Sequence, residues 1–319
     1  MQTPTPLFIP TDEPSVYDLH VDNSAKELFE TCARAAEYYS VQRREGIGER
    51  PALFRGEVIH GACAIRQLHP TDDYQSQQLG YVMRMYADKD FGPDEWRTCE
   101  HAVNSILNYN KTWPVETEPF TLLPNTVEMP FKLRLGTAEL DSEVTTHAGT
   151  FYVKSVNIYY TGIIDSLVDY GTILVKDIKT TSVLGPTFFD DFVLSSQMHG
   201  YVWAARKLGY DAKGLLLDVI AGRKPTKSGV PHEYQRQRFF YTEEHLVEWE
   251  RDTFTLISDF LEHLCRAYFP KSPKWCFGKY GRCQFWDVCS QLPQNRQTML
   301  MSDLYKPVTW NPLQPTPTI

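Results

Sequence analysis

GIIDSLVDYGTILVKDIKTT, residues 162–181, is the stretch of sequence on which the fold depends. Apolar, β-prone runs lie on both sides of Asp169-Tyr170-Gly171. Strands that alternate around a short turn containing glycine are typical of a β-hairpin. If the loop is centred on Gly171, Asp165 pairs with Asp177. The stretch therefore predicts a hairpin in which two carboxylates face each other.

The facing acids predict a cation site. Directly opposed residues of an antiparallel pair have Cβ atoms roughly 4.5–5.5 Å apart, and two carboxylates so close repel unless a proton or a cation lies between them. Mg²⁺ and similar hard cations take such oxygens as ligands. Strand alternation places Lys179 on the face of Asp177 and turns Ile178 into the core.

Two acids and a lysine on one face suit phosphodiester hydrolysis. A bound metal polarises the phosphate and lowers the pKa of a water molecule, and Lys179 stabilises developing negative charge. The alternative interpretation is a hairpin with solvated charges, because a lone D-x-K motif is common.

Length and composition indicate a globular enzyme. The chain has 319 residues, 42% of them hydrophobic and 23% charged, and these values are ordinary for such a protein. No apolar run reaches the roughly 18 residues of a membrane span, and the N-terminus lacks a secretory signal pattern, so we expect a cytoplasmic protein with no membrane partner. The net charge of −8 argues against tight non-specific binding of DNA but not against nuclease chemistry.

The order of expected elements predicts an α/β fold with a central mixed sheet flanked by helices, a helical N-terminal region and a C-terminal cysteine loop. Residues 1–20 are expected to be irregular, 21–295 to form a single domain and 296–319 to form a proline-rich tail. The expected helices cover 24–39, a segment from 53, 71–88, 93–109, 188–208 and 242–269, and the strands lie within 117–181, 215–220 and 234–241.

Three cysteines close to the C-terminus form a second constellation: Cys276, Cys283 and Cys289. Three thiolates need a fourth ligand to complete a zinc site or an iron–sulfur cluster. Zinc sites usually contain paired, closely spaced cysteines, and this stretch has none, so a [4Fe–4S] cluster with one remote cysteine fits better. The alternative is three unrelated buried cysteines. An odd total of seven cysteines in a cytoplasmic chain argues against a disulfide framework.

Other polar residues have weaker signals. Gln197 and Tyr201 are four residues apart and share a helix face, where they either contact a DNA strand and orient the lysine or belong to an ordinary amphipathic helix. His60 offers an imidazole ligand, and Glu128 offers a further carboxylate; a packed histidine and an outward strand residue are the alternatives. A basic loop offers phosphate contacts or is simply solvated: Arg223, Lys224 and Lys227.

These motifs, in this order, resemble the RecB-like branch of the PD-(D/E)xK nuclease superfamily. Residues 162–165 resemble its G-x-x-D strand, and Arg55-Gly56-Glu57-Val58-Ile59-His60 resembles its R-G-x-x-x-H helix. Residues 29–39, which contain Cys32, resemble the early C-P-R-x-x-x-Y-Y helix of members with an iron–sulfur cluster, such as the CRISPR-associated RecB-like exonucleases. The resemblance covers roughly residues 24–290.

The resemblance implies a restriction-endonuclease-like core and a metal-dependent DNA exonuclease that acts on single strands or ends, in phage or prokaryotic replication, recombination or repair. Mg²⁺ or Mn²⁺ would be held by His60, Asp165, Asp177 and the Ile178 carbonyl, while Lys179 assists water attack. A [4Fe–4S] cluster would be held by Cys32, Cys276, Cys283 and Cys289. The implied partners are DNA, a second copy of the chain, or a replication or recombination protein.

The sequence also departs from the family pattern. Asp177 stands where glutamate is common, Ala33 stands where proline is usual, and the last three cysteines have the spacing C-x6-C-x5-C where two and then five is frequent. The rival interpretations are a non-catalytic iron–sulfur DNA-binding or scaffold protein on a nuclease fold, and a zinc-stabilised interaction module.

Overall fold

The computed structural model describes residues 6–48, 50–70, 73–226, 232–278 and 281–309. The chain divides into two units, each assembled from separate segments. Of the described residues, the first contains 6–48, 131–162 and 247–309, and the second contains 50–130 and 163–246, with the gaps given above. The single domain expected over 21–295 stays a prediction.

The second unit is organised around a five-stranded mixed sheet with the strand order β10-β9-β8-β7-β4. Strands β8 and β9 are parallel, and the other neighbours are antiparallel. The mixed sheet expected from the sequence is therefore confirmed. The strands are β4 (Thr121–Leu122), β7 (Ser166–Asp169), β8 (Ile173–Thr181), β9 (Gly214–Gly222) and β10 (His232–Phe240).

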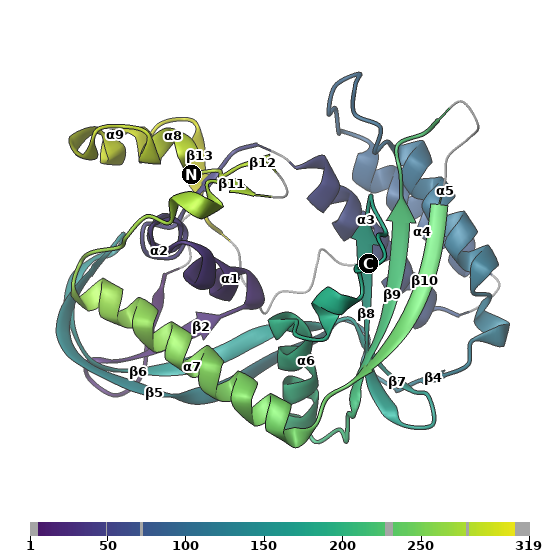
Figure 1. Ribbon diagram of the computed structural model, residues 1–319, viewed down its shortest axis with the longest axis horizontal. Coiled ribbons are helices and arrows are strands. Elements are labelled where there is room, and N and C mark those ends of the chain that lie inside the picture. Colours follow the sequence, from purple (N-terminus) through teal and green to yellow (C-terminus); the bar gives the residue numbers. More distant parts are fainter. Residues whose placement is uncertain (1–5, 49, 71–72, 227–231, 279–280, 310–319) are drawn as a thin grey trace. The chain divides into compact units, whose positions relative to one another are not determined.

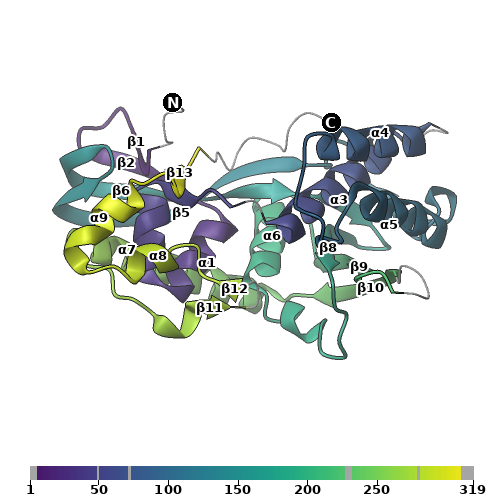
Figure 2. The same cartoon turned by 90° about the horizontal axis from the view of Figure 1, so that it is seen from above.

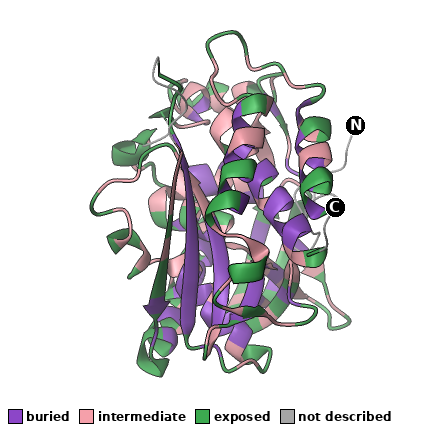
Figure 3. Cartoon of the chain, turned by 90° about the vertical axis from the view of Figure 1, so that its right-hand side faces the viewer, coloured by how far each residue is buried: buried purple, intermediate pink, exposed green. Residues whose placement is uncertain are grey.

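Helices cover this sheet. Figure 2 shows α3 (Pro51–Leu68), α4 (Tyr74–Tyr86) and α5 (Cys99–Thr112) together beside β8, β9 and β10. Their apolar side chains share a core with Ile178 of β8 and Ile220 of β9. Helix α6 (Ser196–Lys207) also packs against β8 and β9. The central strands β8 and β9 are largely buried while the helices keep exposed outer faces (Figure 3).

The first unit contains a four-stranded sheet with the order β1-β2-β6-β5. Its strands are β1 (Phe8–Pro10), β2 (Val16–Val21), β5 (Met129–Thr146) and β6 (Gly149–Ile164). Helices α1 (Asn23–Thr31) and α7 (Glu243–Cys265) lie over β5 and β6 (Figure 1). The rings of Phe29 and Phe260 stack at 4.0 Å and join the two helices in one core.

Short elements complete the first unit. Next to α1 lie α2 (Ala33–Ala36), the π-helical turn Glu37–Val41 and β3 (Arg44–Gly46). The C-terminal part holds Pro273–Trp275, β11 (Phe277–Gly278), β12 (Gly281–Arg282), α8 (Trp286–Cys289), Pro293–Asn295, α9 (Arg296–Leu300) and β13 (Tyr305–Pro307).

Several expectations about elements were wrong, among them the start of the helix expected over 93–109, which begins at Cys99. Residues 1–20 are not wholly irregular, because β1 and β2 pair there. The expected tail contains α9 and β13, and β13 pairs with β3 while Leu300 and Val308 are buried. The helix expected over 24–39 is interrupted at Cys32, whose backbone is extended. Helix α6 begins at Ser196 rather than 188, because the phenylalanines before it pack on one another and on Phe239.

Candidate active site and cysteine cluster

The hairpin register is as the sequence predicts. Ser166 pairs with Lys176 and Asp169 pairs with Ile173, and the same register continued by one residue sets Asp165 against Asp177. Asp165 lies between the end of β6 and the start of β7, so it precedes the ladder rather than belonging to it.

Asp165 is held by a histidine and a backbone amide. Its Oδ2 lies 3.3 Å from His60 Nδ1 and accepts a hydrogen bond of 3.0 Å from the Ile178 N–H. Burial acts to raise the pKa of Asp165, but His60 and Lys179 outweigh it and hold the pKa below its usual value. Burial likewise acts to lower the pKa of His60, and the Asp165 carboxylate raises it.

Asp177 is the most enclosed acid of the group, with its side chain 2% exposed. Lys179 Nζ lies 3.1 Å from Oδ1 in a hydrogen bond and 2.9 Å from Oδ2. Burial raises the pKa of Asp177 despite Lys179. Its Oδ2 is buried, and the contact with Lys179 Nζ lacks hydrogen-bond geometry, so one carboxylate oxygen keeps unused acceptor capacity. Ile178, between the two, is 2% exposed and faces the core as predicted.

Glu128 joins the same site from the loop before β5. Its N–H donates to the Asp165 carbonyl oxygen over 2.9 Å, and its backbone has a φ of 49°. Burial, and then the nearby Asp165, raise the pKa of Glu128 to about 7. A carboxyl group with this pKa beside another acid is a site where a proton or a cation is readily held.

The donor atoms of the site bear on the predicted metal ion. Within the described ranges, no three histidine, cysteine, aspartate or glutamate side chains already stand at positions that would hold a single metal ion. The residue types nevertheless suit Mg²⁺ or Mn²⁺, since oxygen donors predominate and Asp177 Oδ2 lacks a hydrogen bond. Lys179 is the positive group that contacts Asp177, and His60, which is positive only when protonated, contacts Asp165. The roles of Asp165, Asp177, His60, Glu128 and the Ile178 carbonyl as ligands stay predictions.

Helix α6 carries the Gln197–Tyr201 pair. Gln197 Nε2 donates to the Tyr201 hydroxyl over 3.0 Å, which confirms the shared helix face, and α6 packs on β8, the strand of Asp177. Tyr241 was not predicted from the sequence; its pKa is raised by burial and by Asp177. Tyr241 follows an edge strand that is distant in sequence, so no local pattern links it to Asp177.

The basic loop is only partly described. Arg223 is half exposed and forms an ion pair of 3.3 Å with Glu233, and Lys224 is exposed. Lys227 lies outside the described residues. Contact of this loop with phosphates stays a prediction.

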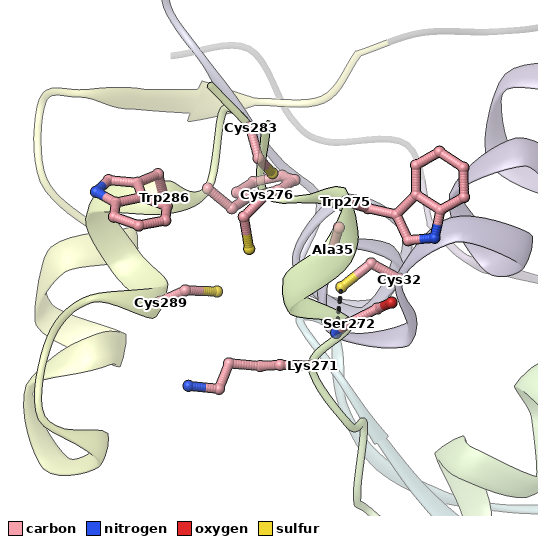
Figure 4. Close-up of a pocket in the computed structure, with 10 residues that line it drawn as sticks. Cys32, Ala35, Lys271, Ser272, Trp275, Cys276, Cys283, Trp286 and Cys289 are labelled. Atoms are coloured by element: carbon pink, nitrogen blue, oxygen red, sulfur yellow. Dashed lines mark hydrogen bonds between the residues drawn. The ribbon is translucent and has the colours of Figure 1, made fainter. Parts of the chain in front are cut away.

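The four predicted cysteines line one cavity: Cys32, Cys276, Cys283 and Cys289. Figure 4 shows the sulfur atoms of Cys32, Cys276 and Cys289 turned towards a common space. The Ser272 N–H donates to Cys32 Sγ over 3.4 Å. Burial raises the pKa of Cys289, and Cys32 and Cys283 raise it further. None of the seven cysteines is in a disulfide.

The cysteine geometry is compatible with the predicted cluster. Each cysteine of a [4Fe–4S] cluster ligates a different iron, whereas one zinc ion draws four thiolates to within about 2.3 Å of a single point. The four thiols line one cavity, and the choice between the two arrangements stays a prediction. Cys63, outside this group, is buried and packs in the core of α3–α5.

Comparisons with known proteins assign no family to this chain. No protein-family model and no curated protein matches this sequence. The structure is similar to the crystal structure of a Eubacterium rectale protein described provisionally as an exonuclease, with 13% identity, coverage of 86% of this chain and 88% of that chain, and a TM-score of 0.45. It is also similar to the crystal structure of SSO0001, with 12% identity, coverage of 77% and 79%, and a TM-score of 0.27. No helix in the described part of the chain has the length and apolar character that a membrane span needs.

Proposed function

We propose that the protein is a Mg²⁺- or Mn²⁺-dependent deoxyribonuclease, and that it acts as an exonuclease on single strands or DNA ends. The observation that carries the proposal is the convergence of Asp165, Asp177, Lys179 and His60 at one hairpin, with Glu128 beside them. Acids that share a site with one lysine and one histidine are the groups that phosphodiester hydrolysis requires.

Each residue of the site would have a separate role in hydrolysis. The acids Asp165, Asp177 and Glu128, with His60 and the Ile178 carbonyl, would hold the divalent ion. When bound, the ion polarises the scissile phosphate and lowers the pKa of a water molecule. Lys179 would orient the attacking water and stabilise negative charge on the phosphate oxygens. Gln197 and Tyr201 orient Lys179 or the DNA strand from α6.

The cysteine cavity serves a structural purpose in this proposal. Cys32, Cys276, Cys283 and Cys289 would hold a [4Fe–4S] cluster that joins the break between α1 and α2 to the C-terminal segment. The four cysteines belong to the first unit and the hydrolytic residues to the second, and the cluster would act as a structural link rather than in the chemical step.

The test is digestion of end-labelled linear single-stranded DNA and of closed circular single-stranded DNA, with Mn²⁺ or with EDTA. Lys179→Met is compared with Lys213→Met, a matched control because Lys213 is half exposed and pairs only with the exposed Asp211 in the described chain. We expect Mn²⁺-dependent loss of the linear substrate alone, with Lys179→Met slower by about 100-fold or more and the control unchanged.

Other outcomes are equally informative. Digestion of both substrates makes the protein an endonuclease at the same site. No digestion by metal-loaded protein with an intact cluster rejects the proposal and favours the non-catalytic DNA-binding or scaffold alternative. Digestion that survives in Lys179→Met places the chemistry elsewhere.

A further inference from the structure

A second polar site lies in the second unit, away from the hydrolytic residues. A cavity of about 270 Å³ opens between the C-terminal half of α3, α5 and the loop that leads to β4. Arg66, Lys176 and Glu118 line it on one side, and Phe120 and Leu122 belong to its apolar wall. Lys176 precedes Asp177 on β8, so its side chain leaves the opposite face of the strand. The cavity therefore lies on the face of β8 opposite to the Asp177 side chain.

The charges around this cavity form a buried network. Lys176 Nζ lies 3.1 Å from Asp218 Oδ2. Arg236 binds Asp218 over 2.8 Å and Glu118 over 2.6 Å, and Arg66 binds Glu118 over 2.8 Å. Each of these five side chains is at most 10% exposed. Ion pairs so enclosed are stable only if their charges and hydrogen bonds are compensated.

The network carries one more positive charge than negative. Its cations are Lys176, Arg66 and Arg236, and its acids are Asp218 and Glu118. Asp218 is ionised because Lys176 and Arg236 outweigh its burial and hold its pKa at about 2.

Neighbouring titratable groups do not supply the missing negative charge. Burial raises the pKa of the Cys63 thiol to about 12 and that of the Tyr109 hydroxyl well above its usual value. Both are therefore neutral near pH 7. Tyr109 moreover donates a hydrogen bond to Asp218 Oδ2 over 2.7 Å.

Several polar atoms at the cavity lack a full set of partners in the described chain. Lys176 Nζ is buried and has no contact with hydrogen-bond geometry. Arg66 uses only Nη2, which donates to the Trp113 carbonyl oxygen and to Glu118. Gln67 Oε1 is buried and has no hydrogen-bond partner. Buried polar groups of native proteins are nearly always paired with protein, water or ligand.

We propose that this cavity binds a small organic anion, a carboxylate or a phosphate ester with a flat apolar body. The anionic group binds Lys176 and Arg66 and balances the excess charge of the network. The apolar body lies against Phe120 and Leu122. The volume falls just below the usual range for ligand pockets, so the ligand is about the size of a single substituted ring. This site is independent of the proposed nuclease activity.

The test uses three probes on the full-length protein: benzoate, phenyl phosphate and the neutral benzamide. Binding is measured by titration calorimetry and by the shift in Tm at about 10 mM probe. We expect at least one anion to bind with one-to-one stoichiometry and a Kd of about 1 mM or lower, and benzamide to bind at least about tenfold more weakly. The anion that binds distinguishes a carboxylate ligand from a phosphate ligand.

Two variants locate the site. Lys176→Met removes the excess charge, and Leu122→Trp fills the cavity without changing any charge; Lys213→Met is the exposed control. We expect both cavity variants to lose binding by about tenfold or more and the control to keep it. If Lys176→Met does not fold, Leu122→Trp and the benzamide comparison still decide. The proposal fails if neither anion binds wild type, if benzamide binds as tightly as benzoate, or if Leu122→Trp binds unchanged.

Discussion

Lys179 and Asp177 are two residues apart on β8, so their side chains leave the same face and form an ion pair of 2.9 Å. We expect Lys179→Met to lower the free energy of unfolding by about 1–3 kcal/mol, because Asp177 is left as a buried acid without its cation. Urea unfolding in EDTA measures this, with Lys213→Met as the control. A variant as stable as wild type would show that the ion pair does not hold Asp177.

Glu128 predicts a pH dependence of stability. Its pKa is raised to about 7 in the folded protein, chiefly by burial, from an ordinary value of 4.5. The folded state therefore holds this proton more tightly than the unfolded state, and the free energy of unfolding falls as the pH rises from about 4.5 to about 7. In EDTA we expect the free energy of unfolding of Glu128→Gln to fall by about 2 kcal/mol less than that of wild type over this pH range.

The measurement is urea unfolding of wild type and Glu128→Gln at pH 5, 6, 7 and 8, each in EDTA. The two proteins should diverge up to about pH 7, with the variant relatively more stable, and run parallel above it. Parallel curves over the whole range would show that Glu128 titrates normally.

At the residue scale, the sequence predicted the acids and the lysine because strand alternation fixes their faces. It did not predict Lys176, Asp218 or Arg236 as partners. Asp218 interrupts the apolar run Leu215–Ile220, and a lone acid in a buried strand indicates a buried ion pair. Its partners, Lys176 and Arg236, however, lie on β8 and β10. Lys176 reaches Asp218 because of the parallel register of β8 and β9, and no local sequence pattern determines that register.

At the scale of elements, the backbone of β10 approaches β9 closely at Gly214. Gly214 pairs with Phe240 of β10 and Leu174 of β8, and a Cβ atom at this position would overlap the backbone carbonyl oxygen of Phe239. We expect Gly214→Ala to cost about 2–4 kcal/mol, because the obstacle is backbone and β10 must move away. Urea unfolding measures the loss.

Gly185→Ala is the control for this substitution, since nothing lies within 4 Å of the added carbon. It should leave stability within about 0.5 kcal/mol of wild type. Equal effects of the two substitutions would mean that β9 and β10 do not pair at Gly214.

The elements differ in how far the sequence defines them. The hairpin, the buried β9 strand and α7 follow from local periodicity and turn residues. The interruption at Cys32 does not, and the residue that contacts its side chain there is distant: the Ser272 N–H binds Cys32 Sγ from 240 residues away. The strands β1, β2 and β13 were missed for a similar reason, since each is short and is defined by its pairing partner.

At the scale of the molecule, the proposed cluster joins two ends of the chain within the first unit. Ala35 and Tyr38 already pack with Phe285, Val288 and Leu300, so the two segments meet through apolar contacts as well. Closing a loop of this length without a covalent link carries a large entropic cost. We therefore expect Cys32→Ala to lower the Tm by about 10 °C and to abolish iron binding.

Cys99→Ala is the matched control, because Cys99 lies on α5 outside the cysteine cavity. Iron and acid-labile sulfide are assayed after anaerobic purification, and Tm by circular dichroism. Zinc in place of iron would favour the zinc-stabilised alternative. An iron content and Tm unchanged in Cys32→Ala would remove Cys32 from the ligand set.

The central claim is that the hairpin acids bind a divalent ion. The most direct measurement is Mn²⁺ binding by electron paramagnetic resonance of the free ion, for wild type, Asp177→Asn and Asp211→Asn. Asp211 is 76% exposed and serves as the control. We expect binding by wild type and by the control, and binding weaker by about tenfold or more in folded Asp177→Asn. Equal Mn²⁺ affinity in Asp177→Asn and wild type, or no binding by wild type, would contradict the claim.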